Sequence, residues 1–164
     1  MSAPRAAPEI RPLTSIALKS CLDTLRPRLA EASVCDLFAG AGRFGEGCLK
    51  EGAARVVFVE KDARQIGALK KIQSGTVVAE DVFQYLVQCG EEFDIVFADP
   101  PFPVWNETFA AQLSGSVLPR LAVGGIFLVK MPKRVLFSLA IPGLKIMKSS
   151  EFGESKLSYW ERVS

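Results

Sequence analysis

The residues best suited to chemistry lie at positions 99–102 and read Asp-Pro-Pro-Phe. They follow the apolar run 93–98, which has the composition of a strand buried in a parallel sheet. Asp99 and the carbonyl of Pro100 can accept hydrogen bonds from a planar amine, while Phe102 can stack on the ring that carries it. A plain turn is the alternative, because aspartate and proline both favour turns. We predict an amine-binding site here.

A second motif lies upstream, where Asp36-Leu-Phe-Ala-Gly-Ala-Gly-Arg-Phe-Gly45 reads as a strand, a glycine loop and the start of a helix. Gly40, Gly42 and Gly45 satisfy the G-x-G-x-x-G spacing that lets backbone approach a nucleoside-bearing cofactor. Glu60 ends the next predicted strand, where its carboxylate can accept hydrogen bonds from ribose hydroxyls. The alternative is a helix–sheet crossover that needs small residues only for close packing.

Two cofactor classes share such a loop, nicotinamide dinucleotides and S-adenosylmethionine. A dehydrogenase needs a second half-site and a substrate region, which 164 residues barely accommodate. The chain has no histidine for proton transfer coupled to hydride transfer, although tyrosine or lysine could serve. The segment from Asp99 to Phe102 has no role in that alternative. The two motifs together therefore predict a methyltransferase acting on an exocyclic amine.

The elements that must position these residues alternate between strand and helix length, which is typical of a sheet covered by helices on both faces. We expect strands at 34–38, 55–59, 76–79, 93–98 and 125–130, with four helices between them. An opening helix is expected from about 13 to 25, ending before Pro27, with Ile16, Leu18, Leu22 and Leu25 on its apolar side. Residues 145–148 and 156–162 are expected to form a closing antiparallel pair, connected by 151–155.

Composition is ordinary for a soluble α/β chain, with 49% hydrophobic and 23% charged residues. The net charge of +2 predicts that any polyanion is bound by a local patch. The four cysteines lack metal-like spacing, so we expect reduced, mostly buried thiols and no metal site. Neither a membrane span nor the apolar centre of a secretory signal is evident, which predicts a cytoplasmic protein.

The chain resembles the class I methyltransferases, and among them the small bacterial family that methylates the N2 amine of a guanine in 16S ribosomal RNA. The resemblance runs from about Arg11 to the C-terminus. The segments that carry it are Arg11-Pro12, Asp36-Leu-Phe-Ala-Gly-Ala-Gly42, Phe58-Val-Glu-Lys-Asp62, Asp81, the run 93–102, and Phe152-Gly-Glu-Ser-Lys-Leu-Ser-Tyr-Trp160. It implies a Rossmann-like α/β fold with a mainly parallel seven-stranded sheet, helices on both faces and a C-terminal antiparallel hairpin.

The resemblance also implies a set of site residues. Gly40 and Gly42 would approach the methionine part of S-adenosylmethionine, Glu60 would hold its ribose, and Asp81 would bond its adenine amino group. Asp36 would order the loop or bind the methionine ammonium. The implied cofactor-binding set is Asp36, Phe38, Ala39, Gly40, Gly42, Glu60, Lys61, Asp81 and Val82, the catalytic set is Asp99, Pro100 and Phe102, and the substrate-binding set is Pro101, Arg11 and Arg43.

The Asp-Pro-Pro-Phe motif does not choose the base, so guanine N2 and a ribosomal RNA or small-subunit partner rest on the resemblance alone. A DNA adenine-N6 or other amino methyltransferase is the enzyme alternative, although such enzymes usually carry a recognition region that is not visible here. A non-catalytic module that binds S-adenosylmethionine or RNA is the alternative of another class. Basic residues that could hold phosphate gather early and late in the chain: Arg5, Arg11, Lys19, Arg26 and Arg28, then Lys130, Lys133, Arg134, Lys145 and Lys148.

The chain departs from the family at its start and at the fifth strand. A basic N-terminal segment is replaced by a short extension over residues 1–12, which we expect to be flexible. Leu13, Leu18 and Lys19 stand where the family tends to have threonine, arginine and glutamate, and Lys130 stands where an acidic residue is more usual. We expect one methyltransferase domain over 13–164, acting as a monomer.

Overall fold

The computed structural model describes residues 12–137 and 140–164, and its centre is a seven-stranded sheet of order β3-β2-β1-β4-β5-β7-β6. The first five strands in sequence run parallel, and β7 pairs antiparallel with both β5 and β6. The predicted α/β fold with a closing antiparallel pair is therefore confirmed. The strands are β1 (Ser33–Leu37), β2 (Arg55–Val59), β3 (Gly75–Val78), β4 (Phe93–Ala98), β5 (Leu121–Pro132), β6 (Leu144–Phe152) and β7 (Ser155–Arg162).

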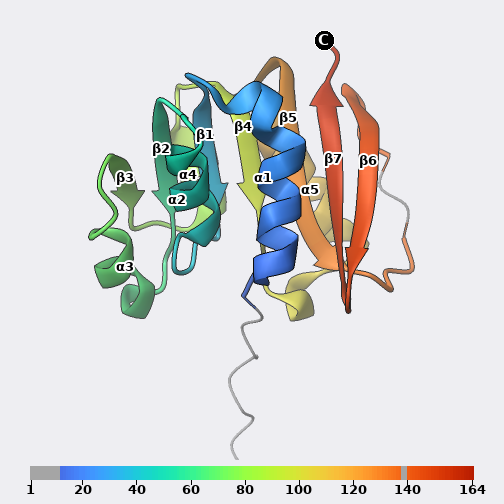
Figure 1. Cartoon of the computed structure of the whole chain (residues 1–164). Coiled ribbons are helices and arrows are strands. Elements are labelled where there is room, and N and C mark those ends of the chain that lie inside the picture. The colour runs from blue at the N-terminus through green and yellow to red at the C-terminus, as the bar shows by residue number, and fades with distance from the viewer. Residues whose placement is uncertain (1–11, 138–139) are drawn as a thin grey trace, which may run out of the picture.

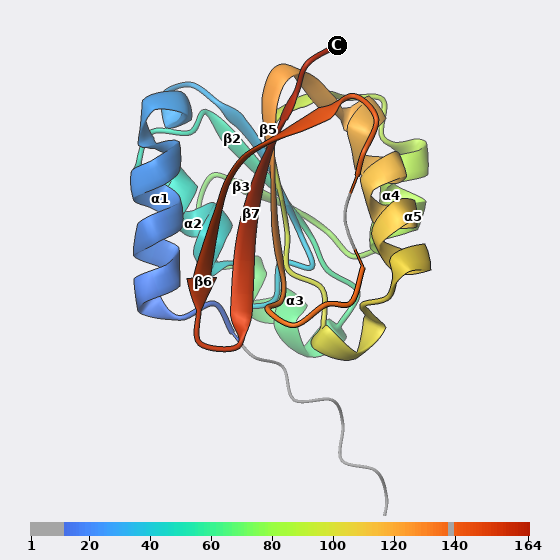
Figure 2. The same cartoon turned by 90° about the vertical axis from the view of Figure 1, so that its right-hand side faces the viewer.

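Helices cover both faces of this sheet, as Figures 1 and 2 show. α1 (Ser15–Leu29) and α2 (Arg43–Lys50) lie on one face, and α4 (Val82–Gln88) and α5 (Glu107–Val117) lie on the other. α3 (Ala63–Leu69) buries Leu69 in the same core as α1 and α2. Two short 3-10 helices, η1 (Phe102–Val104) and η2 (Leu118–Arg120), flank α5. Each face of the sheet therefore has its own hydrophobic core.

The alternation of side chains along the strands divides these two cores. Val34, Ile95 and Leu128 pack in the core under α1 and α2, whereas Cys35 and Val96 pack in the core under α4 and α5. Each strand in the middle of the sheet is thus buried on both sides, which explains its almost continuous apolar sequence.

The opening helix differs from the sequence prediction at its end and on its buried face. Thr14 caps it by accepting a hydrogen bond from the amide of Ala17, and the helix continues past Pro27 to Leu29. Ile16 is 75% exposed, so the expected apolar side was partly wrong. The buried residues are four apart: Ala17, Cys21, Leu25 and Leu29. Proline fits the φ angle of a helix, and the burial of Leu29 offsets the backbone bond that Pro27 cannot make.

Several strand boundaries also differ from the prediction. β1 and β3 lie one residue earlier, and β5 begins at Leu121 because a register shift between Phe93 and Ile95 accommodates the glycines before Ile126. β6 and β7 are longer than expected, because the antiparallel ladder runs from Leu144–Arg162 to Phe152–Ser155 and leaves only a tight turn at Gly153. The connection expected at 151–155 is mostly strand.

Two further facts concern the N-terminal extension and the length of the helices. All of the expected flexible extension except Pro12 lies outside the described residues. Within 12–137 and 140–164, none of the helices is both long enough and apolar enough to cross a bilayer.

Candidate active site

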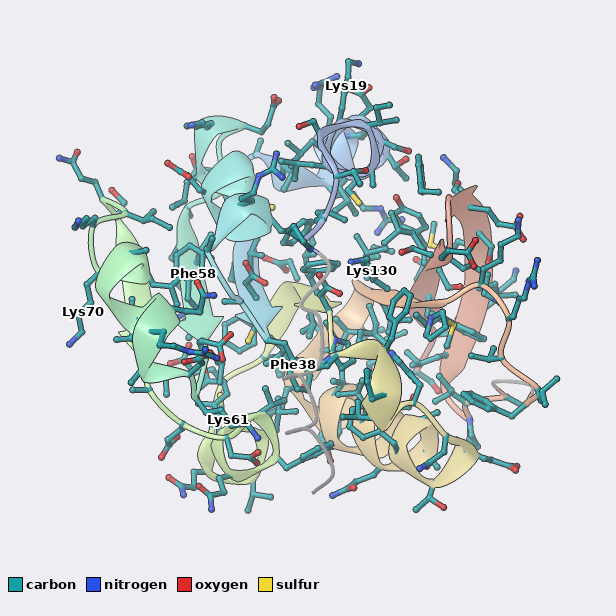
Figure 3. The ribbon with its side chains drawn as sticks, turned by 90° about the horizontal axis from the view of Figure 1, so that it is seen from below. Lys19, Phe38, Phe58, Lys61, Lys70 and Lys130 are labelled. Carbon is teal, nitrogen blue, oxygen red and sulfur yellow. The ribbon has the colours of Figure 1, made fainter. Side chains whose placement is uncertain are left out.

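The sheet brings the two predicted motifs together at the carboxyl ends of β1, β2 and β4. Figure 3 looks onto this edge of the molecule, where Phe38, Lys61 and Lys130 are labelled. The register pairs Leu37 with Val59 and Ala98, so the residues that follow these three strands leave the sheet at one level. This is the edge at which open α/β sheets bind ligands.

The glycine loop leaves β1 through three residues with positive φ. Phe38 has φ 57°, Gly40 55° and Gly42 79°. Inside the loop, the amide of Gly42 donates to the carbonyl of Ala39 over 2.8 Å, and the amide of Ala39 donates to the carbonyl of Val59 over 3.1 Å. A left-handed conformation is unusual for phenylalanine and marks backbone strain of about 1–3 kcal/mol, which proteins tend to store at functional sites.

Glu60 fastens the loop to β2. Its Oε1 accepts the amide of Gly40 at 2.9 Å, and its Oε2 accepts the amides of Lys61 at 2.8 Å and Asp62 at 3.1 Å. A carboxylate offers about four acceptor positions, so it retains capacity for a ligand hydroxyl. Glu60 can therefore bond the backbone at the end of β2 and still accept a hydrogen bond from a ribose hydroxyl, as the sequence predicts. Lys61 has an exposed side chain beside it.

Asp81 is the N-cap of α4. Its Oδ1 accepts the amides of Phe83 at 2.9 Å and Gln84 at 3.2 Å. Val82, the first residue of the helix, is buried in the core of that face. The capping role that aspartate before a helix suggests is thus present, and both bonds fall on one oxygen.

Asp36 is a carboxyl group inside the protein, with only 1% of its surface exposed. It accepts the amide of Gly45 at 3.0 Å, which ties β1 to the first turn of α2. Burial raises the pKa of Asp36 well above its usual value, and the charges of Asp99 and Glu60 raise it further, while the bond from Gly45 opposes them. Deprotonated Asp36 would be stabilised by a positive ligand group.

Asp99 lies beyond β4 on the same face of the sheet as Asp36. Its side chain is 19% exposed and forms an ion pair with Lys130 on β5, with Nζ 3.3 Å from Oδ1 and 3.4 Å from Oδ2. Burial raises the pKa of Asp99 to about 6, and Lys130 acts in the opposite direction. Pro100 is buried, Pro101 is exposed and Phe102 is half-buried, so the turn is buried at its start and partly exposed further along.

Of the two predicted substrate-binding arginines, Arg43 lies among the described residues. Arg43 donates from Nη1 to the carbonyl of Leu13 at 2.6 Å and from Nη2 to the hydroxyl of Ser15 at 3.1 Å, so its guanidinium fastens α2 to the start of α1. Arg11 lies outside the described residues, as does Arg5.

Basic side chains from both groups join α1 to the C-terminal hairpin of β6 and β7, among the residues that the structure describes. Lys148 of β6 donates to the hydroxyl of Thr24 on α1 at 3.1 Å. Several members of the two groups also pair with carboxylates: Lys19 with Asp23, Arg26 with Asp23 and Glu51, Arg28 with Glu161, and Lys133 with Glu151. Lys130 does not belong to a surface patch, because it is 4% exposed.

Sequence reasoning missed two features of this edge. One is the pairing of Lys130 with Asp99, which the partnership of Ala98 with Val129 in the β4–β5 ladder would have indicated. The other is an aromatic cluster beside the glycine loop. Its rings belong to Phe38, Phe83, Trp105 and Phe109, with Phe109 contacting the other three at centroid distances of 6.5, 5.8 and 5.3 Å respectively.

A hollow of about 700 Å³ lies elsewhere, between α2 and the connection from α3 to β3. Its lining includes Leu49, Ile72 and Ser74, and none of the predicted site residues borders it. The candidate site is therefore identified by the polar groups that converge at the strand ends, and not by the volume of this hollow.

The chain is similar to known proteins in both sequence and fold. The family model described as conserved hypothetical protein 95 matches residues 2–161. Ribosomal RNA small subunit methyltransferase D of Escherichia coli K12 is 32% identical over 102 residues, which cover 58% of this chain and 52% of that protein. The chain thus spans about half the length of the curated relatives it matches.

Solved structures match more of the chain. The Escherichia coli protein provisionally named methyltransferase yhhF has a TM-score of 0.81 at 23% identity, covering 94% of this chain and 88% of that one. SMU.776, also provisionally named a methyltransferase and complexed with SAH, has a TM-score of 0.67 at 14% identity, covering 85% and 49%. The fold is the Rossmann-like fold of class I methyltransferases, as the sequence predicted.

Proposed function

We propose that the chain, which belongs to the conserved hypothetical protein 95 family, transfers a methyl group from S-adenosylmethionine to an exocyclic amine of RNA. The observation that carries the proposal is that the glycine loop and the segment 99–102 leave neighbouring strands at one level, since Leu37 at the end of β1 pairs with Ala98 at the end of β4. The name of its Escherichia coli relative supports ribosomal RNA of the small subunit as the target. The finer assignment, N2 of a guanine in 16S ribosomal RNA, rests on the resemblance of the motifs.

The residues at the edge fit this cofactor. An added Cβ at Gly40 would meet nothing within 4 Å, so the loop backbone is open to a ligand. The buried carboxyl of Asp36 matches a ligand ammonium, since a cation would favour its ionised form. Glu60 can accept a bond from the ribose, and Oδ2 of Asp81 can accept one from the adenine amine. Phe38, Ala39, Lys61 and Val82 border these groups in the sequence and complete the proposed set.

S-adenosylmethionine supplies a methyl group on a sulfonium, which is an electrophile. The chain must make a weak nucleophile reactive, because the lone pair of a base amine is delocalised into its ring. Asp99 and the Pro100 carbonyl would accept hydrogen bonds from the two N–H groups of the amine and so concentrate that lone pair on nitrogen, while Phe102 would stack on the base. When bound, S-adenosylmethionine would supply this nitrogen with a methyl group and leave as a thioether, and Asp99 or water would take the proton that the methylated nitrogen loses. Positioning of this kind can supply about 7–11 kcal/mol of a barrier.

The test is transfer of labelled methyl from S-adenosylmethionine to small ribosomal subunits and, separately, to RNA that lacks the modification. Digestion to nucleosides then identifies the base. Labelled N2-methylguanosine is the expected product. Label in N6-methyladenosine would overturn the guanine assignment, and label that appears only when DNA is supplied in place of RNA would favour the DNA methyltransferase alternative.

Substitution of Asp99 tests the mechanism. Asp99→Ala should lower turnover by on the order of 100-fold or more, because it removes an acceptor used at the reacting nitrogen. Cofactor affinity, measured by calorimetry, should change little. Asp94→Asn is the matched control, since Asp94 lies at the other end of β4 and accepts bonds from Ser33. Normal methylation by Asp99→Ala would exclude the amine-binding role. Tight cofactor binding by the wild type without turnover on any nucleic acid would favour a non-catalytic module.

A further inference from the structure

Lys130 is a buried lysine within the site, and its surroundings are unusual for that residue type. It ends a run of apolar residues on β5 and is 4% exposed. Lysine is almost never buried so deeply unless its charge is paired. Its ammonium meets the carboxylate of Asp99 through both oxygens, at 3.3 and 3.4 Å.

The same ammonium lies 5.8 Å from the centre of the Phe102 ring. This distance is within the range of about 6 Å in which a cation is attracted to an aromatic face. Lys130 therefore contacts both side chains that the proposed mechanism uses, the acceptor and the stacking platform. Asp99 and Phe102 lie on one turn, so a single charge on the neighbouring strand fixes both ends of that turn.

We propose that Lys130 is the positioning residue of this site: its buried ammonium fixes Asp99 and Phe102 relative to each other and keeps the Asp99 carboxylate ionised to receive a neutral amine. This inference rests on the proposed function for its chemistry, although the pairing can be tested without a substrate. It assigns Lys130 a role within the site and removes it from the surface residues expected to bind phosphate.

The groups facing Asp99 explain why such a cation is required. Asp36 on β1 interacts unfavourably with the Asp99 charge, and burial adds to the cost of ionising either group. Cys21 on α1 also faces Asp99, but burial raises the pKa of its thiol to about 12, so it stays neutral near pH 7. Lys130 is the cation that opposes these effects on Asp99. It also disfavours a substrate that carries a positive charge, such as a protonated lysine side chain.

The direct test is a pH titration of Asp99 that is monitored by ¹³C NMR in protein labelled at the aspartate carboxyl carbons. The Asp99→Asn variant assigns the Asp99 signal. Lys130→Met removes the charge and keeps an unbranched side chain, Lys130→Gln is a second neutral variant, and Lys130→Arg keeps the charge. Lys133→Met is the control, because Lys133 pairs with Glu151 instead. The neutral variants should raise the Asp99 midpoint by at least about one pH unit. Lys130→Arg and Lys133→Met should leave it near the wild-type value.

The second readout is the pH profile of methyl transfer. If the midpoint moves from about 6 to near 8, the ionised fraction of Asp99 at pH 7 falls by roughly tenfold, and kcat should fall in proportion and recover as the pH rises. The KM for the cofactor should not change. An unmoved midpoint in both neutral variants overturns the role of Lys130. If the neutral variants move the Asp99 midpoint but the wild-type protein methylates no substrate, the pairing of Lys130 with Asp99 stands and the proposed function is overturned.

Discussion

At the residue scale, two glycines of one motif have different physical purposes. Gly40 has a positive φ, and an added methyl group there would enter open space. Gly45 lies in the first turn of α2, where an added Cβ would come within 2.4 Å of the Phe58 ring and 2.7 Å of Val56. The first position faces the proposed cofactor, and the second allows α2 to pack on β2.

The two alanine substitutions should therefore separate binding from stability. Gly40→Ala should cost about 1–2 kcal/mol of stability, the penalty of a left-handed residue, and should weaken cofactor binding at least tenfold. Gly45→Ala should cost about 1–3 kcal/mol through overpacking, with cofactor affinity preserved in the fraction that folds. Urea unfolding and calorimetric titration measure the two quantities. Equal effects of both variants on affinity would exclude this division of roles.

The sequence predicts such residues unequally. The positions of Asp99 and Glu60 at the edge of the sheet can be predicted, because each follows an apolar run and the end of a parallel strand is also the edge of the sheet. Lys130 was assigned to a basic surface group, because a lysine after apolar residues resembles a strand end in solvent. Only the β4–β5 register, which spacing does not fix, shows that it meets Asp99. The ring contacts of Phe109 were missed for the same reason, since they join residues from three separate segments.

At the element scale, α1 shows how packing overrides a local signal. Pro27 predicts that the helix ends early, and propensity alone would support this. The helix continues because Leu25 and Leu29 are both buried against the sheet, at 1% and 0% exposure. Arg28 then donates to the carbonyl of Gly124 at 2.8 Å and ties the end of α1 to the first part of β5. The class of fold follows from the alternation of strands and helices in the sequence, whereas the length of α1 depends on contacts distant in sequence.

Truncation of α1 side chains tests which face is buried. Leu25→Ala should lower the free energy of unfolding by about 2–5 kcal/mol, because it leaves a cavity in the core under α1. Ile16→Ala should change it by less than about 0.5 kcal/mol, since Ile16 is 75% exposed. Chemical denaturation at one pH suffices for the comparison. A larger effect at Ile16 than at Leu25 would mean that α1 is rotated on the sheet.

At the scale of the whole molecule, the chain concentrates acidic groups at one edge of an otherwise ordinary α/β sheet. Asp36 lies within β1 and Asp99 follows the neighbouring strand β4, on the same face of the sheet, and Glu60 directly follows β2. A net charge of +2 gives no indication of this concentration. The free-energy cost of ionising these carboxyl groups arises only when the fold removes them from water. It therefore follows from their burial in the structure and not from the composition of the chain. Such a cost is typical of sites that are stabilised by their ligand.

This arrangement predicts how stability depends on pH. Burial raises the pKa of Asp99 to about 6 and that of Asp36 well above its usual value, so the native state holds protons that the unfolded state has released above pH 4. The free energy of unfolding without cofactor should therefore fall as the pH rises from about 4 through 6. Its derivative with respect to pH is negative wherever the native state binds more protons than the unfolded state. Asp23 and Asp62 have lowered pKa values from their bonds with Lys19 and Arg64, and their opposite effect belongs to lower pH.

Thermal unfolding from pH 4.5 to about 7.5, with and without S-adenosylmethionine, measures this dependence. The cofactor-free protein should lose stability over the range, and added cofactor should restore more of it at the upper end, because the ligand ammonium favours ionised Asp36. Asp36→Asn cannot ionise and keeps an acceptor for Gly45, so it should flatten the decline and stabilise the free protein at neutral pH while weakening cofactor binding. If Asp36→Asn retains the wild-type dependence on pH, Asp36 is not the source of the decline. If it binds cofactor as tightly as the wild type, the proposed contact with the ammonium is wrong, even where the stability of the free protein follows the expected course.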